Sequence, residues 1–393
     1  MSQKSITLTH LTKHISGTVQ LTGSKSESNR ALIIKALSKG NVAIENLSEA
    51  DDTILLTQAL ALANTASADS KTIDIGPAGT AMRFMTSYLN LVPGKFTLTG
   101  SARMQQRPLG ILVDALKDIG AEIHYPEKAG FPPLQIEGKI FQGKDTVKIK
   151  GNVSSQYISS LLLIAASLKK GLTIEIEGEL TSHPYVTMTL NMLQEAGISH
   201  IWTDHTIQIA PQEAKETTLY IEPDWSAASY WYAMVALAES AEIRLPGLKK
   251  NSLQGDIAIA EIMTHFGVKT IFEEKGILLQ KVNLQSSQKV FDFKECPDLA
   301  QTIVVVAAAL GLNISLTGLE TLKIKETDRI AALQNEIGKF GATLTADNET
   351  YHLDASKVKE EANISIATYE DHRMAMAFAP LALIFKQITI EEP

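Results

Sequence analysis

The arginines of this chain are few and are concentrated in short polar or glycine-bearing segments. Only seven of its 36 lysines and arginines are arginines. Six of the seven lie in such segments: Arg30, Arg83, Arg103, Arg107, Arg329 and Arg373. Arginine presents five N–H donors in a rigid fork that fits carboxylate and phosphate, whereas lysine is a flexible point charge. Scattered surface ion pairs would distribute arginine in the same way as lysine. The pattern therefore predicts a ligand with several negative charges.

The first such segment is GSKSESNRALIIKAL, residues 23–37. A glycine turn is predicted to bring Lys25, Ser26, Ser28 and Arg30 to the start of a helix. Free backbone N–H groups, hydroxyls and two cations at a helix N-terminus form an anion site. An ordinary serine cap would explain Ser26 or Ser28, but not the two cations together.

Other segments of the N-terminal half also place donors at predicted helix starts. In residues 75–89, Gly79 opens a helix and leaves room for a ligand to approach the backbone. This segment is neither a Walker loop nor a dinucleotide fingerprint. Arg107 precedes Pro108, which we expect to be the first residue of a helix that runs to Ile119.

A fourth helix start carries uncharged donors: Ser154, Ser155 and Gln156. Hydroxyls and a carboxamide suit a polyhydroxylated ligand, although a capping serine is the simpler explanation of the segment on its own.

The C-terminal half combines cations with carboxylates. In KIKETDRIAAL, Lys325 and Arg329 are four residues apart, so we expect them on one helical face. His372 and Arg373 precede another apolar helix. Asp298 lies at the predicted N-terminus of a buried helix, where a helix cap and a functional role are both open from the local sequence.

A repeated pattern of helix, glycine, strand, turn and strand must position these residues. It occurs around Gly120, Gly197, Gly267 and Gly341, roughly every 75 residues, which is longer than a solenoid unit. Each glycine is predicted to end its helix in the left-handed conformation. Five or six such α/β copies fit the chain. The best boundary is near residues 222–224, which predicts two lobes with a ligand between them.

Composition excludes several classes of protein. The 393 residues are 45% hydrophobic and 20% charged, as in soluble globular proteins, and the net charge of −8 argues against a general nucleic-acid binder. A single cysteine, Cys296, rules out a disulfide framework. The longest apolar run, residues 303–312, is about half of a membrane span and predicts a buried helix. The start of the chain lacks a signal-peptide pattern, and the histidines lack metal-ligand spacing. We expect a cytoplasmic protein without a metal.

Taken together, these segments resemble the 5-enolpyruvylshikimate-3-phosphate synthase family, in order and over residues 21–384. The resemblance is carried by GSKSESNRAL, AGTAMR, RMQQRPLG, SSQY, KETDR and DHRMAMAF. It implies an inside-out α/β barrel of two lobes, each with three βαβαββ repeats. Residues 22–222 would form the lobe on the shikimate 3-phosphate side, and residues 1–21 with 223–393 the lobe that closes over the cleft.

The resemblance also implies a reaction. The enolpyruvyl group of phosphoenolpyruvate would pass to the 5-hydroxyl of shikimate 3-phosphate by addition and elimination, on the pathway to chorismate and aromatic amino acids, with no cofactor. Fixed cations would offset the repulsion between two phosphates and two carboxylates. We expect a monomer that binds no nucleic acid or membrane and is inhibited by glyphosate.

The family's residue roles transfer to matching positions. Residues implied for phosphoenolpyruvate are Lys25, Gly79, Arg107, Gln156, Arg329 and Arg373. Residues implied for shikimate 3-phosphate are Ser26, Arg30, Ser154, Ser155, Gln156, Ser182, Asp298 and Lys325. Residues implied for proton transfer are Asp298, Glu326 and Lys25, with His372 a weaker candidate.

Three features depart from the family pattern. Pro77 and Thr321 stand where the family usually or often has asparagine, so contacts to the sugar-like ring differ there. Family members also continue beyond a C-terminal strand with a further lysine, whereas no lysine follows Lys386. From this we expect impaired catalysis by the chain as given.

Two other functions remain open. The sister family that transfers enolpyruvyl to a UDP-sugar uses a cysteine-bearing lid, whereas Cys296 precedes a predicted helix. A non-catalytic phosphosugar-binding protein would keep the pocket without turnover. Release of phosphate from phosphoenolpyruvate and shikimate 3-phosphate separates all three.

Overall fold

The structure is a computed structural model, and it describes residues 5–65, 70–152, 154–284, 288–359 and 363–392. The chain divides into two compact units, each considered by itself. The first unit is Thr22–Glu222, and the second unit is Met1–Leu21 together with Pro223–Pro393.

The first unit contains two complete βαβαββ repeats. One comprises β4 (Lys71–Asp74), α3 (Gly79–Tyr88), β5 (Lys95–Thr99), α4 (Gly110–Asp118), β6 (Glu122–His124) and β7 (Leu134–Glu137). The other comprises β8 (Thr146–Lys150), α5 (Ser155–Ala165), β9 (Leu172–Glu177), α6 (His183–Glu195), β10 (Ile201–Thr203) and β11 (Thr206–Ile209). In each repeat the first two strands pair in parallel and the last two form an antiparallel hairpin.

A third repeat of the first unit is closed by a strand from far along the chain. It comprises α1 (Lys25–Leu37), β3 (Val42–Glu45) and α2 (Asp51–Ala63), followed only much later by β12 (Thr217–Tyr220). β12 pairs in parallel with β3, in the register Thr217 opposite Val42. The ends of this unit are thereby joined.

The second unit has one complete repeat and two that use the N-terminal strands. The complete repeat comprises β16 (Val290–Asp292), α9 (Ala300–Ala309), β17 (Ile314–Thr317), α10 (Arg329–Gly338), β18 (Thr343–Asp347) and β19 (Thr350–Asp354). The next comprises β2 (His14–Thr18), α7 (Trp225–Leu237), β13 (Ser240–Pro246), α8 (Ile259–Ile262), β14 (Val268–Glu273) and β15 (Gly276–Lys281). The last comprises β20 (Asn363–Ala367), α11 (His372–Phe378), β21 (Gln387–Glu391) and β1 (Ser5–Leu8).

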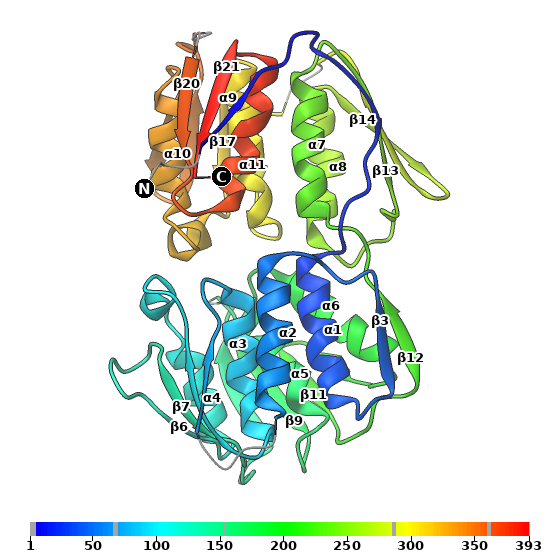
Figure 1. Cartoon of the computed structure of the whole chain (residues 1–393), viewed down its shortest axis with the longest axis vertical. Coiled ribbons are helices and arrows are strands. Elements are labelled where there is room, and N and C mark those ends of the chain that lie inside the picture. Colours follow the sequence, from blue (N-terminus) through cyan, green and yellow to red (C-terminus); the bar gives the residue numbers. More distant parts are fainter. Residues whose placement is uncertain (1–4, 66–69, 153, 285–287, 360–362, 393) are drawn as a thin grey trace. The chain divides into compact units, whose positions relative to one another are not determined.

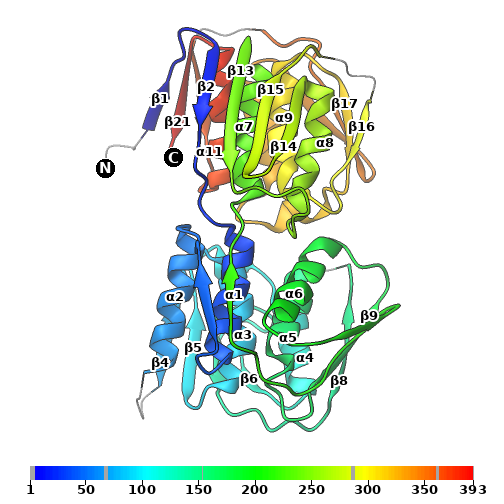
Figure 2. The same ribbon diagram turned by 90° about the vertical axis from the view of Figure 1, so that its right-hand side faces the viewer.

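Within each unit the helices pack against one another and the sheets lie around them, although α2 has one uncovered face (Figures 1 and 2). The burial pattern explains this arrangement. Strands alternate, as in β7, where Leu134 and Ile136 are buried and Gln135 and Glu137 are exposed. Central helices are buried on all sides, and α9 is fully buried from Ala300 to Ala308. The α/β repeats and the buried helix predicted from the sequence are confirmed.

Short 3₁₀ turns precede several helix starts and shift them from the expected positions. α4 begins at Gly110, not at Pro108 as predicted, because Leu109 has the non-helical dihedrals φ −130° and ψ −3° and takes the N-cap position. α10 begins at Arg329, with Asp328 as its N-cap, so Lys325 lies before the helix. The predicted shared helical face of Lys325 and Arg329 is therefore wrong.

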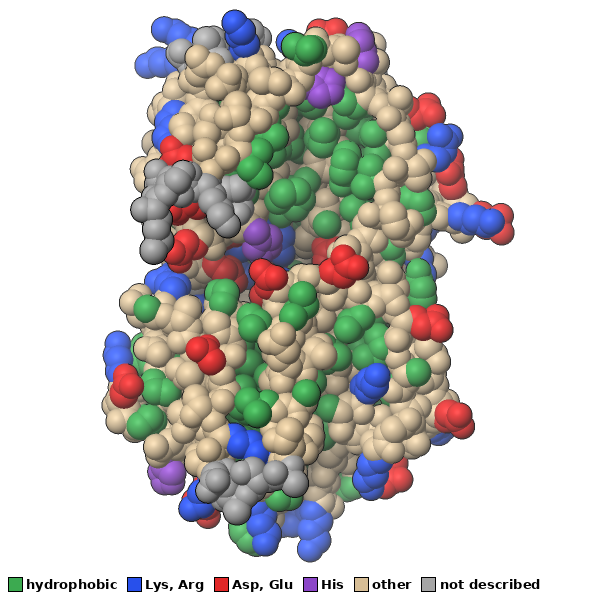
Figure 3. Space-filling model, viewed as in Figure 1, with side chains coloured by type: hydrophobic (Ala, Val, Ile, Leu, Met, Phe, Trp, Pro, Cys, Tyr) green, Lys and Arg blue, Asp and Glu red, His purple; other side chains and the backbone are tan. Residues whose placement is uncertain are grey.

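The surface is mixed in character. Acidic and basic side chains are scattered over the visible face of the first unit, and hydrophobic side chains gather in a hollow over α7 of the second unit (Figure 3). Among the described residues, no helix is both long enough and apolar enough to cross a membrane.

The four glycines that end the repeat helices have the predicted left-handed conformation, with φ of 111° at Gly120, 81° at Gly197, 77° at Gly267 and 93° at Gly341. A Cβ atom on Gly341 would also lie 2.4 Å from the carbonyl oxygen of Lys357, whereas nothing lies within 4 Å of one on Gly338, the last residue of α10.

Gly341→Ala should destabilise the second unit by ~1–3 kcal/mol, because it combines a strained φ with a backbone clash. Gly338→Ala should stabilise it by ~0.5–1 kcal/mol, because alanine loses less backbone entropy in a helix. Urea unfolding of both variants measures the difference. Equal effects of the two substitutions would contradict the assigned role of Gly341.

Candidate active site

In the first unit the N-termini of α1, α3, α5 and α6 converge. Arg30 of α1 connects three of these helices: its Nε donates to Thr189 of α6 at 2.7 Å, and its Nη2 donates to Ser159 of α5 at 3.2 Å. Gln156 of α5 donates to Thr80 of α3 at 3.2 Å. The donors predicted from separate sequence segments thus belong to one region of this unit.

Arg30 is a structural centre as well as a candidate ligand. Its side chain is 1% exposed, and it also donates to the carbonyls of Ser26 at 2.8 Å and Tyr185 at 3.1 Å. Burial lowers the pKa of Arg30 to about 10, although Tyr185 and Glu27 partly offset the effect. The buried guanidinium would be stabilised by an anion, yet most of its N–H groups already hold α1, α5 and α6 together.

The other polar residues near the start of α1 are either part of the packing or able to reach solvent. Ser24, not Ser26 or Ser28, caps the helix by accepting from the N–H of Glu27 at 3.4 Å. Ser28 is fully buried and accepts from the N–H of Ser48. Lys25 pairs with Asp52 of α2 at 3.2 Å, and its side chain is 21% exposed. Ser28 is therefore part of the packing, whereas Lys25 can reach solvent.

Gly79 gives room to an arginine. A Cβ atom at this position would lie 2.5 Å from Nη1 of Arg107 and 3.0 Å from Cζ. The guanidinium of Arg107 therefore lies against the first turn of α3, and only glycine permits this approach. Arg83, one turn along, donates to the carbonyl of Gly79 at 2.8 Å. Two buried arginines thus flank one helix start.

The uncharged donors occupy two neighbouring helix starts. Ser154 is the N-cap of α5 and accepts from the N–H of Gln156 at 3.3 Å, as the simpler explanation predicted. Ser155 is its first helical residue. Ser182 precedes α6 with φ 55° and ψ 43°, a left-handed conformation that is costly for serine, and its side chain does not cap the helix. Such strain is typical of functional positions.

The second unit contains a carboxylate held by three cations. Asp298 Oδ1 accepts from Arg329 Nη1 at 3.0 Å and lies 3.5 Å from Lys325 Nζ, and its Oδ2 accepts from Arg373 Nη2 at 3.0 Å. Asp298 lies in a 3₁₀ turn (Pro297–Leu299) before α9, and Leu299 occupies the N-cap position. Asp298 is therefore not the cap of α9.

Arg329 lies at the centre of this cluster. Its Nε donates to Asp371 at 2.7 Å and its Nη2 to Glu326 at 2.9 Å, and its side chain is 2% exposed. Burial alone would lower the pKa of Arg329, but the carboxylates of Asp371, Glu326 and Asp298 outweigh burial and raise it. Asp371 in turn caps α11 by accepting from the N–H of Arg373 at 2.9 Å.

Lys325 and His372 differ in their surroundings. Burial lowers the pKa of Lys325, and the nearby Asp298 only partly reverses this. His372 is exposed at the first position of α11. The sulfur of Cys296 is buried, and burial together with neighbouring carboxylates raises the pKa of its thiol. Cys296 therefore does not have the character of a reactive lid cysteine.

Each unit thus gathers polar and charged side chains near its own helix starts. The first offers cations and hydroxyls, and the second offers carboxylates held among cations. The family model described as EPSP synthase (3-phosphoshikimate 1-carboxyvinyltransferase) matches residues 10–63 and 61–393. This chain belongs to the EPSP synthase family.

Individual relatives agree with this membership. The chain is 49% identical to the 3-phosphoshikimate 1-carboxyvinyltransferase of Bacteroides fragilis, over 96% of this chain and 91% of the relative. It is 36% identical to the 3-phosphoshikimate 1-carboxyvinyltransferase of Vibrio cholerae, over 96% of this chain and 93% of the relative. Both sequence identities are well above those of proteins that share only a fold.

Solved structures support the fold. The EPSP synthase of Acinetobacter baumannii superposes with a TM-score of 0.76 at 20% identity, over 99% of this chain and 94% of that one. An enolpyruvyl transferase of Streptomyces tendae superposes with a TM-score of 0.70 at 15% identity, over 99% of this chain and 93% of that one. At these identities the likeness concerns the fold.

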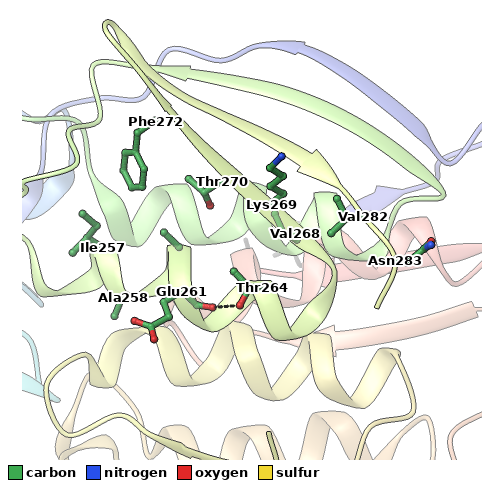
Figure 4. Close-up of a pocket in the computed structure, with 11 residues that line it drawn as sticks. Ile257, Ala258, Glu261, Thr264, Val268, Lys269, Thr270, Phe272, Val282 and Asn283 are labelled. Atoms are coloured by element: carbon green, nitrogen blue, oxygen red, sulfur yellow. Dashed lines mark hydrogen bonds between the residues drawn. The ribbon is translucent and has the colours of Figure 1, made fainter. Parts of the chain in front are cut away.

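A separate cavity of about 800 Å³ lies between α8 and β14 of the second unit (Figure 4). Ile257, Val268 and Phe272 contribute apolar walls, and Glu261 and Lys269 contribute charges. The described residues that line this cavity include none of the predicted site residues. It is therefore distinct from the Asp298 cluster.

The sequence interpretation missed two members of the Asp298 cluster. Asp256, in the 3₁₀ turn Gly255–Ala258, is 3% exposed and accepts a hydrogen bond from Ser226 in the first turn of α7. Ser226 Oγ is also 3.5 Å from Arg373 Nη2. The available signal was a polar loop, NSLQGD, directly before an apolar helix.

Asp256→Asn should stabilise the protein at pH 8 more than at pH 5. Burial, with Asp298 adding to it, raises the pKa of Asp256 from 3.8 to about 7. As the pH rises through this range the folded state must ionise a buried group that is already ionised in the unfolded chain, so stability falls. The asparagine variant avoids this loss, which is on the order of 2–4 kcal/mol.

Melting temperatures of the wild type and the variant at pH 5 and pH 8 test this prediction. Exposed Asp347, changed to asparagine, is the control. A stability difference between Asp256→Asn and the wild type that does not change with pH would contradict the raised pKa.

Proposed function

We propose that this family member transfers the enolpyruvyl group of phosphoenolpyruvate to the 5-hydroxyl of shikimate 3-phosphate and releases phosphate. Family membership over nearly the whole chain supports the reaction. The observation that carries the assignment chemically is Asp298, a carboxylate held by Lys325, Arg329 and Arg373. Fixed cations beside a base are what the reaction of two anionic substrates requires.

Proton transfer is assigned to the carboxylates. In the addition step the 5-hydroxyl oxygen bonds to C2 of phosphoenolpyruvate and its proton passes to Asp298, while C3 takes a proton from an acid. In the elimination step a methyl proton leaves C3, the double bond re-forms and phosphate departs. Glu326, 2.9 Å from Arg329, is the candidate for C3 protonation, with Lys25 as the alternative. Exposed His372 remains the weaker candidate.

Substrate binding is assigned from the roles that the family implies at matching positions and from the charge of each side chain. For phosphoenolpyruvate we propose Lys25, Arg107, Arg329 and Arg373, with Gly79 and Gln156 beside them. For shikimate 3-phosphate we propose Ser26, Arg30, Ser154, Ser155, Gln156, Ser182 and Lys325. Since Arg30 also holds three helices together, Lys325→Ala is a cleaner binding test than Arg30→Ala. We expect the enzyme to act as a monomer in the cytoplasm, and light scattering tests the first point.

The direct experiment follows phosphate release from the two substrates. Release that requires both substrates supports the proposal. The UDP-sugar reaction is disfavoured because Cys296 is buried. Binding without any phosphate release would instead favour a non-catalytic phosphosugar-binding protein.

Asp298→Asn should lower kcat by ~10²–10⁴-fold, because it removes a general base while keeping the side-chain shape. KM for shikimate 3-phosphate should change much less. Steady-state kinetics measure both values, and Asp347→Asn is a surface control. Near-normal kcat in Asp298→Asn would leave Asp298 only an electrostatic partner of the three cations.

Gly79→Ala should raise KM for phosphoenolpyruvate about tenfold, because the added methyl group displaces the Arg107 guanidinium and one charge-assisted contact is lost. We propose that glyphosate competes for the same contact, so its inhibition constant should rise in parallel. Gly110→Ala is the control, because a Cβ there meets only an ordinary contact at 3.5 Å. Glyphosate inhibition independent of phosphoenolpyruvate concentration would refute a shared pocket.

A further inference from the structure

Asp256 is a buried acid that the proposed reaction does not use. It is 3% exposed, and of its two oxygens Oδ2 accepts from Ser226 while Oδ1 is buried and lacks a hydrogen-bond partner among the described residues. A carboxyl group buried with one oxygen unsatisfied is costly to fold. Stability alone therefore does not account for its presence beside the Asp298 cluster.

The loop that carries Asp256 is fixed to the start of α7. Gln254 accepts from the N–H of Trp225 at 2.8 Å and donates to the carbonyl of Pro223 at 2.9 Å. Asp224 caps α7 by accepting from the N–H of Ala227 at 2.9 Å. These bonds hold Asp256 and Ser226 in a constant relation to each other.

Ser226 links Asp256 to Arg373. Because its single hydroxyl proton is donated to Asp256, its lone pairs are left to face the Arg373 Nη2 at 3.5 Å. The same Nη2 donates to Asp298 at 3.0 Å. Asp256, Ser226, Arg373 and Asp298 therefore form one continuous polar chain from the loop to the proposed base.

We propose that Asp256 and Ser226 are positioning residues that hold the Arg373 guanidinium for phosphoenolpyruvate. Asp256 fixes the Ser226 hydroxyl as an acceptor, and Ser226 then holds one edge of the guanidinium. Such support lets a cation bind its substrate in a set orientation, and its loss affects binding more than chemistry. This inference rests on the proposed function, since it takes Arg373 as a ligand of phosphoenolpyruvate.

The test compares two disruptive variants with two matched controls. Ser226→Ala removes the acceptor, and Asp256→Leu removes the carboxylate that orients it while keeping the branching of the side chain. Asp256→Asn keeps an acceptor for the hydroxyl and should rescue. Ser229→Ala is the control for the serine, because Ser229 is also buried on α7 but donates to the backbone carbonyl of Ser226.

We expect Ser226→Ala and Asp256→Leu to raise KM for phosphoenolpyruvate about tenfold, with kcat and KM for shikimate 3-phosphate changed less than twofold. Asp256→Asn and Ser229→Ala should stay within twofold of wild type. An unchanged KM for phosphoenolpyruvate in Ser226→Ala, or an equal rise in Ser229→Ala, would overturn the proposal.

A second readout separates this inference from the proposed function. Crystal structures of the wild type and Ser226→Ala show directly whether Arg373 changes rotamer, whatever the protein's turnover. A displaced guanidinium in the variant supports positioning, and an unmoved one contradicts it. Absence of phosphate release by the wild type would count against the proposed function, but the rotamer comparison would still decide the role of Ser226 and Asp256.

Discussion

The second unit depends on one buried cation. Arg329 begins α10 and pairs with Asp298 before α9, with Glu326 in its own loop and with Asp371 at the start of α11. With its amide oxygen turned toward Arg329, Gln301 of α9 accepts from Nε at 3.0 Å. A charge this deeply buried must be paired, because burying an unpaired one destabilises the folded state by about several kcal/mol. The ion pairs of Arg329 therefore hold the starts of α9, α10 and α11 together. The same pairs fix the position of Asp298, the candidate base.

The first unit also contains a buried arginine, but its partners are of a different kind. Arg30 is equally buried, but hydroxyls and carbonyls of α1, α5 and α6 surround it in place of carboxylates. Phe84 and Tyr185 also lie 5.5 Å and 5.8 Å from its guanidinium carbon, within range of cation–π attraction. Its positive charge is therefore only partly compensated within the unit. The charge of Arg329, in contrast, is paired with three carboxylates.

The repeated βαβαββ fold makes both arrangements possible. Helices packed inside a ring of sheets bring their N-termini close together, where unsatisfied N–H groups favour anions. The loops before these helices can therefore bring their side chains together. In the second unit these loops supply Asp256, Asp298 and Asp371, three acids from distant parts of the chain. Asp256 and Asp371 are at most 3% exposed, so each relies on hydrogen-bond donors of the protein and not on water.

The sequence by itself determined the repeat, its glycine ends, the buried helix α9 and the chemical types at the helix starts, because these follow from local periodicity and from the fit of arginine to anions. The roles at the site remain proposals. Only the tertiary structure decided which side chains meet. In the structure Lys325 lies before α10, and Leu299, not Asp298, is the N-cap of α9. Arg30 and Ser28 are part of the packing. Asp256 and Ser226 are connected to Arg373 by hydrogen bonds. These outcomes depend on contacts between residues as far apart as Ser226 and Arg373, for which local spacing contains no information.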